Sequence, residues 1–309
     1  MSPPLFEGIY PILTTPFLED ESLDLESLDR MVRFILTLGV EGITVLGVLG
    51  EANRLTDAER AQVIRAAVAA AGAKPVIVGT SHSGTRAALE LSKSAEALGA
   101  RAVMVAPQAE AVPNEERVAE YFRVIGEGIG IPIVLQDHPA STQVHMSVAL
   151  ILRILRDVPR VSAIKQEAVP TAPKIRALAT GMKERKVPIL TGLGALYGLF
   201  DLEAGSSGFN TGFAFPEVLM AMVAASRQGD WGKARALYTR FLPLIVFEQQ
   251  PGVAIRKEIL RLRGAIRSNR VRHPGGALPA ETARQLQTLL DTLLPGQDLT
   301  KPIDLGTWT

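Results

Sequence analysis

Short apolar runs recur through most of the chain, separated by segments in which apolar residues follow a helical spacing. Polar residues do not alternate regularly within the runs, which is typical of parallel strands that are covered on both faces. The runs start about thirty residues apart, which is the length of one strand-helix unit. We therefore expect parallel strands at residues 8–17, 42–47, 75–81, 102–107, 132–137, 161–167, 188–192 and 207–212.

Helical segments lie between these runs, and three of them cover residues 25–39, 56–72 and 85–99. Thr56 begins the second segment, and Glu59 follows it at the spacing of a capping box, in which each side chain bonds the other residue's backbone N–H. Each segment reaches a glycine of the kind that left-handed helix ends prefer, at Gly39, Gly72 and Gly99. Strands and helices therefore alternate along the chain.

The number of strand-helix units predicts an α/β fold, a closed (β/α)8 TIM barrel. An open doubly wound sheet is the alternative, but the first strand-helix turn has no GxGxxG motif and no P-loop occurs. The later part of the chain is helical only, over residues 216–229, 231–250, 252–264 and 279–294. We expect a barrel over residues 1–229 and a C-terminal helical extension over residues 230–309 that packs on it. Arg256 and Lys257 in this extension are expected on a solvated helix face.

Composition narrows the classes of protein that fit this pattern. The chain has 309 residues, of which 47% are hydrophobic, and its net charge is +1. We therefore expect neither nucleic acid nor an anionic membrane as a partner. The absence of cysteine excludes thiolate catalysis, and the four histidines form no HxxxH pair, so no metal is expected. No signal peptide and no apolar run of ~18 residues is recognisable, which predicts a cytoplasmic protein.

The run at residues 161–167 ends in the first candidate for chemistry. Lys165 follows the apolar residues of this run, and Glu167 lies two positions after Lys165. Side chains two apart on a strand share a face, so both should point with Val161 and Ala163 into the barrel. Active sites of such barrels lie at the carboxyl ends of the strands, where a desolvated neutral amine can form a Schiff base with a ketone. The alternative is a strand-end lysine that reaches solvent and pairs with Glu167.

Two other strand ends carry candidate binding groups. The turn after the second strand contains Gly47, Val48 and Leu49, and its glycines allow backbone N–H groups to hold a carboxylate. An ordinary tight turn is the alternative for this segment. The fifth strand ends in Gln136 and Asp137, which we expect at the same rim, although Asp137 before His138-Pro139 is also a common turn residue.

The ordered set of motifs resembles the dihydrodipicolinate synthase/N-acetylneuraminate lyase family of Schiff-base barrel enzymes over residues 8–265. The motifs are "GIYPILTTPF", "GVLGEANRLTDAER", "PVIVGTSHSGTRAALELSKSAEALGARAVMVAPQ", "LQDHP" and "AIKQEA". The resemblance implies that Lys165 forms the Schiff base with a 2-oxo acid. It also implies substrate binding by the turn at Gly47, Val48 and Leu49 and by Asn210 and Thr211 at the pocket rim. It implies no cofactor and a homotetramer built as a dimer of dimers.

The chain departs from the family's synthases and aldolases at the end of the fifth strand. Gln136 occupies the place of a tyrosine that relays protons in those enzymes. Gln108 or Ala109 occupies the place of a second tyrosine. Val48 and Leu49 occupy the places of two threonines, and Ser141 occupies the place of an arginine. An amide does not titrate near neutral pH, so Gln136 cannot act as the general acid or base.

The same departures resemble a subgroup of the family, the 2-keto-3-deoxy-pentonate dehydratases, such as the L-2-keto-3-deoxyarabonate enzyme. The shared features are "QDHPAST", the Thr80-Ser81-His82 turn, Lys165 with Glu167, the Arg272-His273-Pro274 segment and "LPLIVFEQQPGVAIRKEILRLRGAI".

This resemblance implies dehydration of a 2-keto-3-deoxy sugar acid, with Lys165, Glu167 and Gln136 as the catalytic group. For His82, substrate contact and capping of the third helix are equal alternatives. The alternatives for the whole protein are a pyruvate-dependent aldolase, a synthase that condenses pyruvate, and a non-catalytic 2-oxo-acid binding protein.

Overall fold

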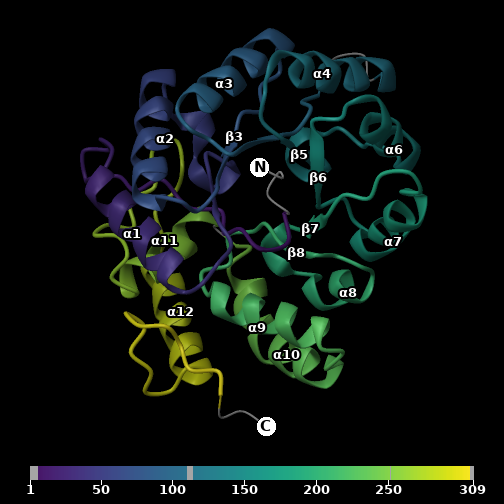
Figure 1. The fold of residues 1–309 in the computed structure, drawn as a ribbon. Helices are drawn as coiled ribbons and strands as arrows, with labels where there is room; N and C mark the ends of the chain where they lie inside the picture. The colour runs from purple at the N-terminus through teal and green to yellow at the C-terminus, as the bar shows by residue number, and fades with distance from the viewer. Residues whose placement is uncertain (1–5, 110–113, 251, 307–309) are drawn as a thin grey trace.

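A computed structural model describes residues 6–109, 114–250 and 252–306 of the chain. The first residues of the N-terminal segment, in which no signal peptide is recognisable, and residues 307–309 of the expected C-terminal extension lie outside the described residues. Eight parallel strands form one sheet in the order β1-β8-β7-β6-β5-β4-β3-β2. A parallel bridge between Ile12 and Thr44 joins the two ends of the sheet. The predicted (β/α)8 barrel is therefore confirmed, with helices around the sheet (Figure 1).

The strands are shorter than the apolar runs that predicted them. Their bounds are β1 Gly8–Ile9, β2 Ile43–Val45, β3 Val76–Gly79, β4 Ala102–Val105, β5 Ile133–Asp137, β6 Val161–Gln166, β7 Ile189–Thr191 and β8 Gly208–Phe209. The first run differs most, because it contains Pro11 and Pro16, which have no N–H to donate to a neighbouring strand. The strand positions along the chain are otherwise as expected.

Helices connect the strands and continue beyond the last one. The long barrel helices are α1 Leu25–Thr37, α2 Asp57–Ala71, α3 Thr85–Ala97, α4 Glu115–Gly128, α6 Val148–Asp157, α7 Thr171–Gly181 and α9 Pro216–Arg227. Short helices are η1 Val48–Gly50, η2 Ala52–Arg54, α5 Pro139–Thr142, η3 Leu193–Ala195 and α8 Gly198–Glu203. Thr56 and Glu59 form the expected capping box. Gly39, Gly72 and Gly99 all have positive φ, as expected where the first three helices end.

Two apolar clusters divide the core. The inner cluster fills the barrel and consists of Phe6, Tyr10, Ile77, Ala102, Met104, Val134, Ala163 and Leu190. The outer cluster lies between the sheet and the helices and contains Val161. Val161 was expected inside the barrel, and that expectation is wrong. The register shifts so that Ile133 pairs with Val161 but Val134 pairs with Ala163, and the extra residue, Ser162, turns Val161 outward.

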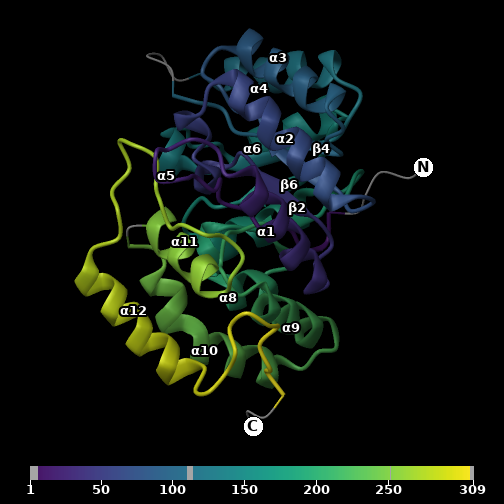
Figure 2. The same cartoon turned by 90° about the vertical axis from the view of Figure 1, so that its left-hand side faces the viewer.

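The extension comprises α10 Trp231–Phe247, α11 Val253–Leu262 and α12 Ala280–Leu293. These helices lie together against one side of the barrel (Figure 2). The Tyr238 hydroxyl of α10 donates to the Leu196 carbonyl at 2.7 Å, and the outer cluster includes residues from both parts. The barrel and the extension share one apolar cluster. The domain boundary between residues 229 and 230 therefore stays a proposal.

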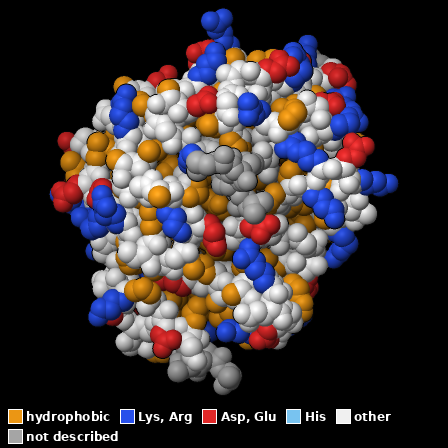
Figure 3. Space-filling model, viewed as in Figure 1, with side chains coloured by type: hydrophobic (Ala, Val, Ile, Leu, Met, Phe, Trp, Pro, Cys, Tyr) orange, Lys and Arg blue, Asp and Glu red, His pale blue; other side chains and the backbone are white. Residues whose placement is uncertain are grey.

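The surface carries mixed charge, in keeping with 33 Lys and Arg and 32 Asp and Glu residues in the chain. Lys and Arg side chains are interspersed with Asp and Glu on the face in Figure 3. In the part of the chain that the structure describes, no helix combines the length and the apolar character needed to cross a bilayer.

Candidate active site

Lys165, Glu167 and Gln136 form one buried polar group. Gln136 of β5 pairs in register with Lys165 of β6, so both side chains point into the barrel above Val134 and Ala163. Lys165 Nζ lies 3.1 Å from Glu167 Oε2. Gln136 Nε2 donates to the same oxygen at 2.7 Å. The three side chains are at most 5% exposed, so this amine and this carboxylate face each other away from bulk water.

The alternation of β5 separates Gln136 from its neighbour. Asp137 was expected at the same rim, but it points outward and lies 2.6 Å from Lys174 Nζ of α7. Burial raises the pKa of Asp137, and Lys174 opposes that shift. Successive residues of a strand face opposite sides. Asp137 therefore ties β5 to the helix layer and is not part of the polar group inside the barrel.

Glu167 is held in its ionised form by its neighbours. Burial opposes ionisation, but Lys165, then His138, and the hydrogen bonds from Gln136 and Leu193 outweigh it, so the pKa of Glu167 lies below its usual value. His138 Nδ1 is 4.0 Å from Glu167 Oε2. An ionised carboxylate 3.1 Å from an amine can accept its proton, which is how a lysine nucleophile is activated.

The loop that follows β7 also contacts this polar group, and the sequence did not predict that contact. The Leu193 N–H donates to Glu167 Oε1 at 3.0 Å. Gly192 lies so close that a Cβ atom there would be 2.2 Å from Glu167 Oε1. The only signal in the sequence is the pair of glycines in "TGLGA" at residues 191–195. Such a pair indicates close approach of the backbone, but it does not say to what.

The turn after β2 lies above the inner cluster. A Cβ atom at Gly47 would lie 3.0 Å from Ile12 Cγ2 and 3.5 Å from Cε of Met104, which belongs to that cluster. Val48 is 58% exposed. The Leu49 side chain packs on Gly212, where a Cβ would meet Leu49 Cδ1 at 2.0 Å. The turn therefore opens towards the barrel mouth, and carboxylate binding by its amides stays a prediction.

The remaining predicted binding residues lie in three different environments. His82 is exposed, and its Nδ1 accepts from the Gly84 N–H at 3.0 Å at the start of α3. Asn210 is buried and donates to the Tyr10 carbonyl and to Thr44 Oγ1 at 2.9 and 2.7 Å. The Thr211 carbonyl accepts from the Ile12 N–H. Hydrogen bonds and ion pairs of the described residues join none of these three to Lys165 or Glu167, so their substrate roles stay predictions.

Arg256 and Lys257 are not on a solvated face, and that expectation is wrong. Arg256 is 4% exposed and Lys257 is fully buried. Arg256 Nε lies 2.9 Å from Glu248 Oε2, and Lys257 Nζ lies 2.5 Å from Glu51 Oε1. A buried cation is tolerated when a carboxylate offsets the cost of removing it from water. Glu248 is only eight positions before Arg256, at the end of the preceding helix, whereas Glu51 comes from a segment far away in the sequence. No local helical spacing indicates the partner of Lys257.

The fold is a (β/α)8 barrel, and a buried lysine lies near the carboxyl end of β6, the end of the strands at which such barrels carry their active sites. The chain belongs to the dihydrodipicolinate synthetase family, whose model matches residues 5–293. It is 34% identical over 300 residues to the L-2-keto-3-deoxyarabonate dehydratase of Azospirillum brasilense, a match that covers 95% of this chain and 96% of that protein.

Solved structures agree with this assignment. A dihydrodipicolinate synthase from Rhodopseudomonas palustris matches with a TM-score of 0.88 and 36% identity, covering 92% of this chain and 97% of that chain. A prophage protein of the same family from E. coli K12, solved in complex with pyruvate, matches with a TM-score of 0.86 and 27% identity. The latter match covers 94% of this chain and 99% of that chain. The family is shared by proteins with different printed activities, so the specific reaction has to be argued from the site.

Proposed function

We propose that the protein is a Schiff-base lyase that dehydrates a 2-keto-3-deoxy sugar acid. The observation that carries the proposal is the buried pair of Lys165 and Glu167, 3.1 Å apart, with Gln136 where synthases and aldolases of the family carry a tyrosine. The pair supplies a nucleophile and a proton acceptor, and the amide supplies no titrating group. These three residues are the catalytic group of the proposal.

The reaction begins at the amine. Glu167 accepts the proton of the Lys165 ammonium, and the neutral amine attacks the C2 carbonyl of the substrate. Loss of water leaves an iminium ion that makes the C3 protons acidic. Glu167 returns its proton to the departing oxygen and is ionised again. It then removes one C3 proton, which leaves an enamine.

Elimination and release complete the cycle. The enamine expels the C4 hydroxyl, which takes the proton held by Glu167 and leaves as water. The unsaturated iminium ion loses a proton from C5 and gains one at C3, and the resulting C4–C5 enol tautomerises to an aldehyde. Water then hydrolyses the iminium ion, restores Lys165 and releases an oxo semialdehyde that has lost one water in total. Glu167 therefore acts as base and as acid in turn. Its pKa, lowered by Lys165 and its other partners, keeps the carboxylate ionised before the reaction begins.

Gln136 supports the catalytic pair without titrating. Its Nε2 donates to Glu167 at 2.7 Å and holds the carboxylate beside the amine. Aldol cleavage needs a base at the C4 hydroxyl, which the tyrosine provides in relatives and an amide cannot provide.

Two comparisons support the proposal. The A. brasilense relative is a dehydratase that aligns over 95% of this chain, and the E. coli neighbour binds pyruvate, a 2-oxo acid. The R. palustris neighbour is a synthase, which keeps condensation of pyruvate as the second candidate reaction. A non-catalytic binding protein is the third candidate. The buried amine-carboxylate pair disfavours it, because binding alone does not need a nucleophile beside a proton acceptor.

Two experiments test the proposal. The protein is incubated with pyruvate and borohydride, and its mass is measured before and after digestion; we expect one reduced adduct, on Lys165. A Lys165→Met variant is the matched control and should gain none. Incubation with L- and D-2-keto-3-deoxy-pentonates should then yield an oxo semialdehyde without pyruvate. Pyruvate as the product would establish an aldolase instead, and absence of any adduct would reject the Schiff base.

We also propose a homotetramer, a dimer of dimers, in the cytoplasm. The support is the resemblance to family members that assemble in this way. Sedimentation equilibrium of the purified chain measures the assembly directly, and a monomer at micromolar concentration would contradict it.

A further inference from the structure

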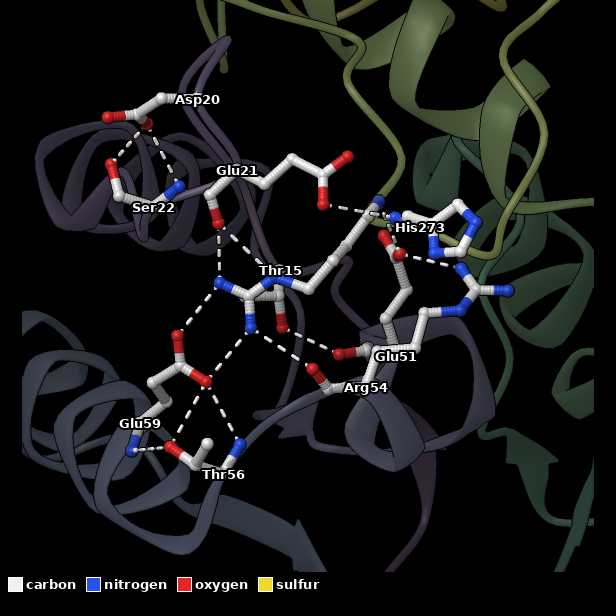
Figure 4. A network of polar contacts seen from close by, with 11 residues as sticks. Thr15, Asp20, Glu21, Ser22, Glu51, Arg54, Thr56, Glu59 and His273 are labelled. Atoms are coloured by element: carbon white, nitrogen blue, oxygen red, sulfur yellow. Dashed lines mark hydrogen bonds and ion pairs between the residues drawn. The ribbon is translucent and has the colours of Figure 1, made fainter.

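The turn after β2 is anchored by a buried carboxylate at its end. Glu51 directly follows η1, has φ +52°, and its N–H donates to the Val48 carbonyl at 3.1 Å. A left-handed non-glycine residue is strained and needs external support. Glu51 Oε2 accepts from Arg54 Nη1 at 2.7 Å and from the Arg272 N–H at 3.0 Å, and Figure 4 shows this network.

Lys257 supplies the remaining support from the extension. Its Nζ lies 2.5 Å from Glu51 Oε1, donates to the Arg270 carbonyl at 2.6 Å, and stands 4.4 Å from the centre of the Phe17 ring. Lys257 is fully buried, so its charge depends on these groups for compensation. The backbone of Val48 and Leu49 is thus tied, through Glu51, to α11.

Arg256, the residue before Lys257 on α11, reaches a different loop. A Cβ atom at Gly194 would lie 2.9 Å from Arg256 Nη2 and 2.0 Å from Gln249 Nε2. Gly194 adjoins Leu193, whose N–H donates to Glu167. Arg256 is itself held by Glu248, which accepts from the Ala214 N–H at 3.2 Å. The α10–α11 junction therefore packs directly against the loop that fixes Glu167.

We propose that Lys257 and Arg256 are positioning residues for two separate parts of the reaction. Lys257 sets the turn that binds the substrate carboxylate, and Arg256 sets the loop that orients Glu167. The inference rests on the proposed function, because it assigns Lys257 to substrate binding and Arg256 to proton transfer in the proposed reaction. The helical extension is then a part of the active-site scaffold, although none of its residues needs to contact the substrate.

The two cations should separate in steady-state kinetics. A looser carboxylate turn weakens binding of substrate and transition state alike, which raises KM and leaves kcat unchanged. A misplaced Glu167 slows proton transfer after binding, which lowers kcat and leaves KM unchanged. A general loosening of the extension would instead change both parameters together in both variants.

Charge-neutral double variants test this without leaving a lone buried charge. For Lys257→Met with Glu51→Gln we expect KM to rise ~10-fold or more, with kcat within ~3-fold of wild type. For Arg256→Met with Glu248→Gln we expect kcat to fall ~10-fold or more, with KM within ~3-fold. The conservative Lys257→Arg and Arg256→Lys variants should restore most of the affected parameter. If a double variant does not fold, as judged by its melting curve, the single Glu51→Gln and Glu248→Gln variants carry the same comparison, because each weakens one of the two ion pairs while keeping the shape of the side chain.

The matched control is Arg263→Met with Glu217→Gln. This pair is equally buried and also joins the extension to α9, but Arg263 does not touch η1 or η3 in the contacts described. Both kinetic parameters should stay within ~3-fold of wild type. Equal changes in all three double variants, or no change in the first two, would overturn the positioning roles.

Borohydride trapping distinguishes this inference from the proposed function. The Lys257 double variant should need more pyruvate for half-maximal trapping, whereas the Arg256 double variant should trap at the wild-type concentration. Normal trapping by wild type with unchanged half-maximal concentrations in the Lys257 variant rejects the role of Lys257 alone. No trapping by wild type rejects the proposed function itself, and with it this assignment of parts.

Discussion

The two sides of the barrel mouth are built by different means. On the β5–β7 side, the partners of Glu167 are Lys165 two positions before it, Gln136 31 positions away and Leu193 26 positions away. On the β2 side, Glu51 is held by Lys257 and by Arg272, the latter 221 positions away. Neighbouring strands in register bring Lys165 and Gln136 together on the first side, where the extension contacts the loop after β7. The second side is held mainly by the docked extension.

This difference indicates which part of the structure determines the chemistry of the site and which part determines substrate binding. Strand register is cooperative with the whole sheet, so the amine and carboxylate stay together as long as the barrel is folded. Ion pairs to an extension depend on how that extension packs, and buried pairs lose much when one partner is removed. Changes on the β5–β7 side should therefore alter chemistry, and changes on the β2 side should alter binding and stability.

The largest effect is expected on the β5–β7 side, for Glu167→Gln. The variant keeps the shape of the side chain but removes its ability to exchange protons. We expect turnover to fall roughly 10²- to 10⁴-fold while the Lys165 adduct with pyruvate still forms. Rates of semialdehyde formation and adduct masses measure the two outcomes. Wild-type turnover in this variant would remove Glu167 from the mechanism.

A smaller effect on the same side is expected for Gly192→Ala. The new methyl group would stand 2.2 Å from Glu167 Oε1, so the carboxylate has to move from its hydrogen bond with Leu193. We expect kcat to fall roughly 10- to 100-fold with a nearly unchanged melting temperature. Gly276→Ala is the matched control, because a Cβ there meets nothing within 4 Å. Equal kinetics for both variants would show that the close approach has no functional consequence.

On the β2 side, Arg272→Gln should lower stability and affinity but not turnover. Arg272 donates to both carboxylate oxygens of Glu59 and to the carbonyls of Glu21 and Arg54. Glu21, Arg54 and Glu59 are labelled in Figure 4. We expect a loss of about 2 kcal/mol in unfolding free energy and a raised KM with the same kcat. The exposed pair of Arg284 with Glu281 provides the control, since Arg284→Gln should cost under about 0.5 kcal/mol.

The loss for Arg272→Gln should depend on pH. The hydrogen bond from Arg272, more than the other contacts, lowers the pKa of Glu59 to about 2. A depressed carboxylate pKa contributes stability that is present above the ordinary value near 4.5 and is lost as pH falls towards 2. The difference between wild type and variant should therefore shrink in acid. A pH-independent difference in urea unfolding would contradict this origin.

The smallest functional effect is expected behind β7, for Asp201→Asn. Asp201 of α8 accepts from Thr171 Oγ1 of α7 at 2.6 Å, and burial raises its pKa to about 6 against the opposing hydrogen bonds from Thr171 and Thr191. A raised acid pKa contributes stability that is present below the ordinary value near 3.8 and is lost as pH rises through about 6. The neutral amide avoids that loss.

We expect Asp201→Asn to unfold at higher urea than wild type at pH 7.5, by at most about 3 kcal/mol, and to differ little at pH 4. Activity at pH 7.5 should be unchanged, because Asp201 lies in the helix layer outside the catalytic strands. Asp291→Asn on the exposed face of α12 serves as the control and should show no such pH dependence. A variant that is less stable than wild type at pH 7.5 would contradict the sign.

Local patterns by themselves determined much of this protein. Continuous apolar runs at regular intervals determined the number and order of the strands, because parallel strands in a barrel are buried on both faces. Thr56 with Glu59 determined where α2 begins, since a capping box acts within four residues. The two-residue spacing of Lys165 and Glu167 predicted their shared face, which the structure confirms at 3.1 Å.

Only the tertiary structure decided the features that depend on contacts between distant segments. The register shift at Ser162 turned Val161 outward, and the loop after β7 placed Gly192 and Leu193 against Glu167. Lys257 shows the physical reason most clearly. A lysine in an amphipathic helix has the same local pattern whether it faces water or a carboxylate. The cost of removing it from water is offset only when the barrel brings Glu51 to within 2.5 Å.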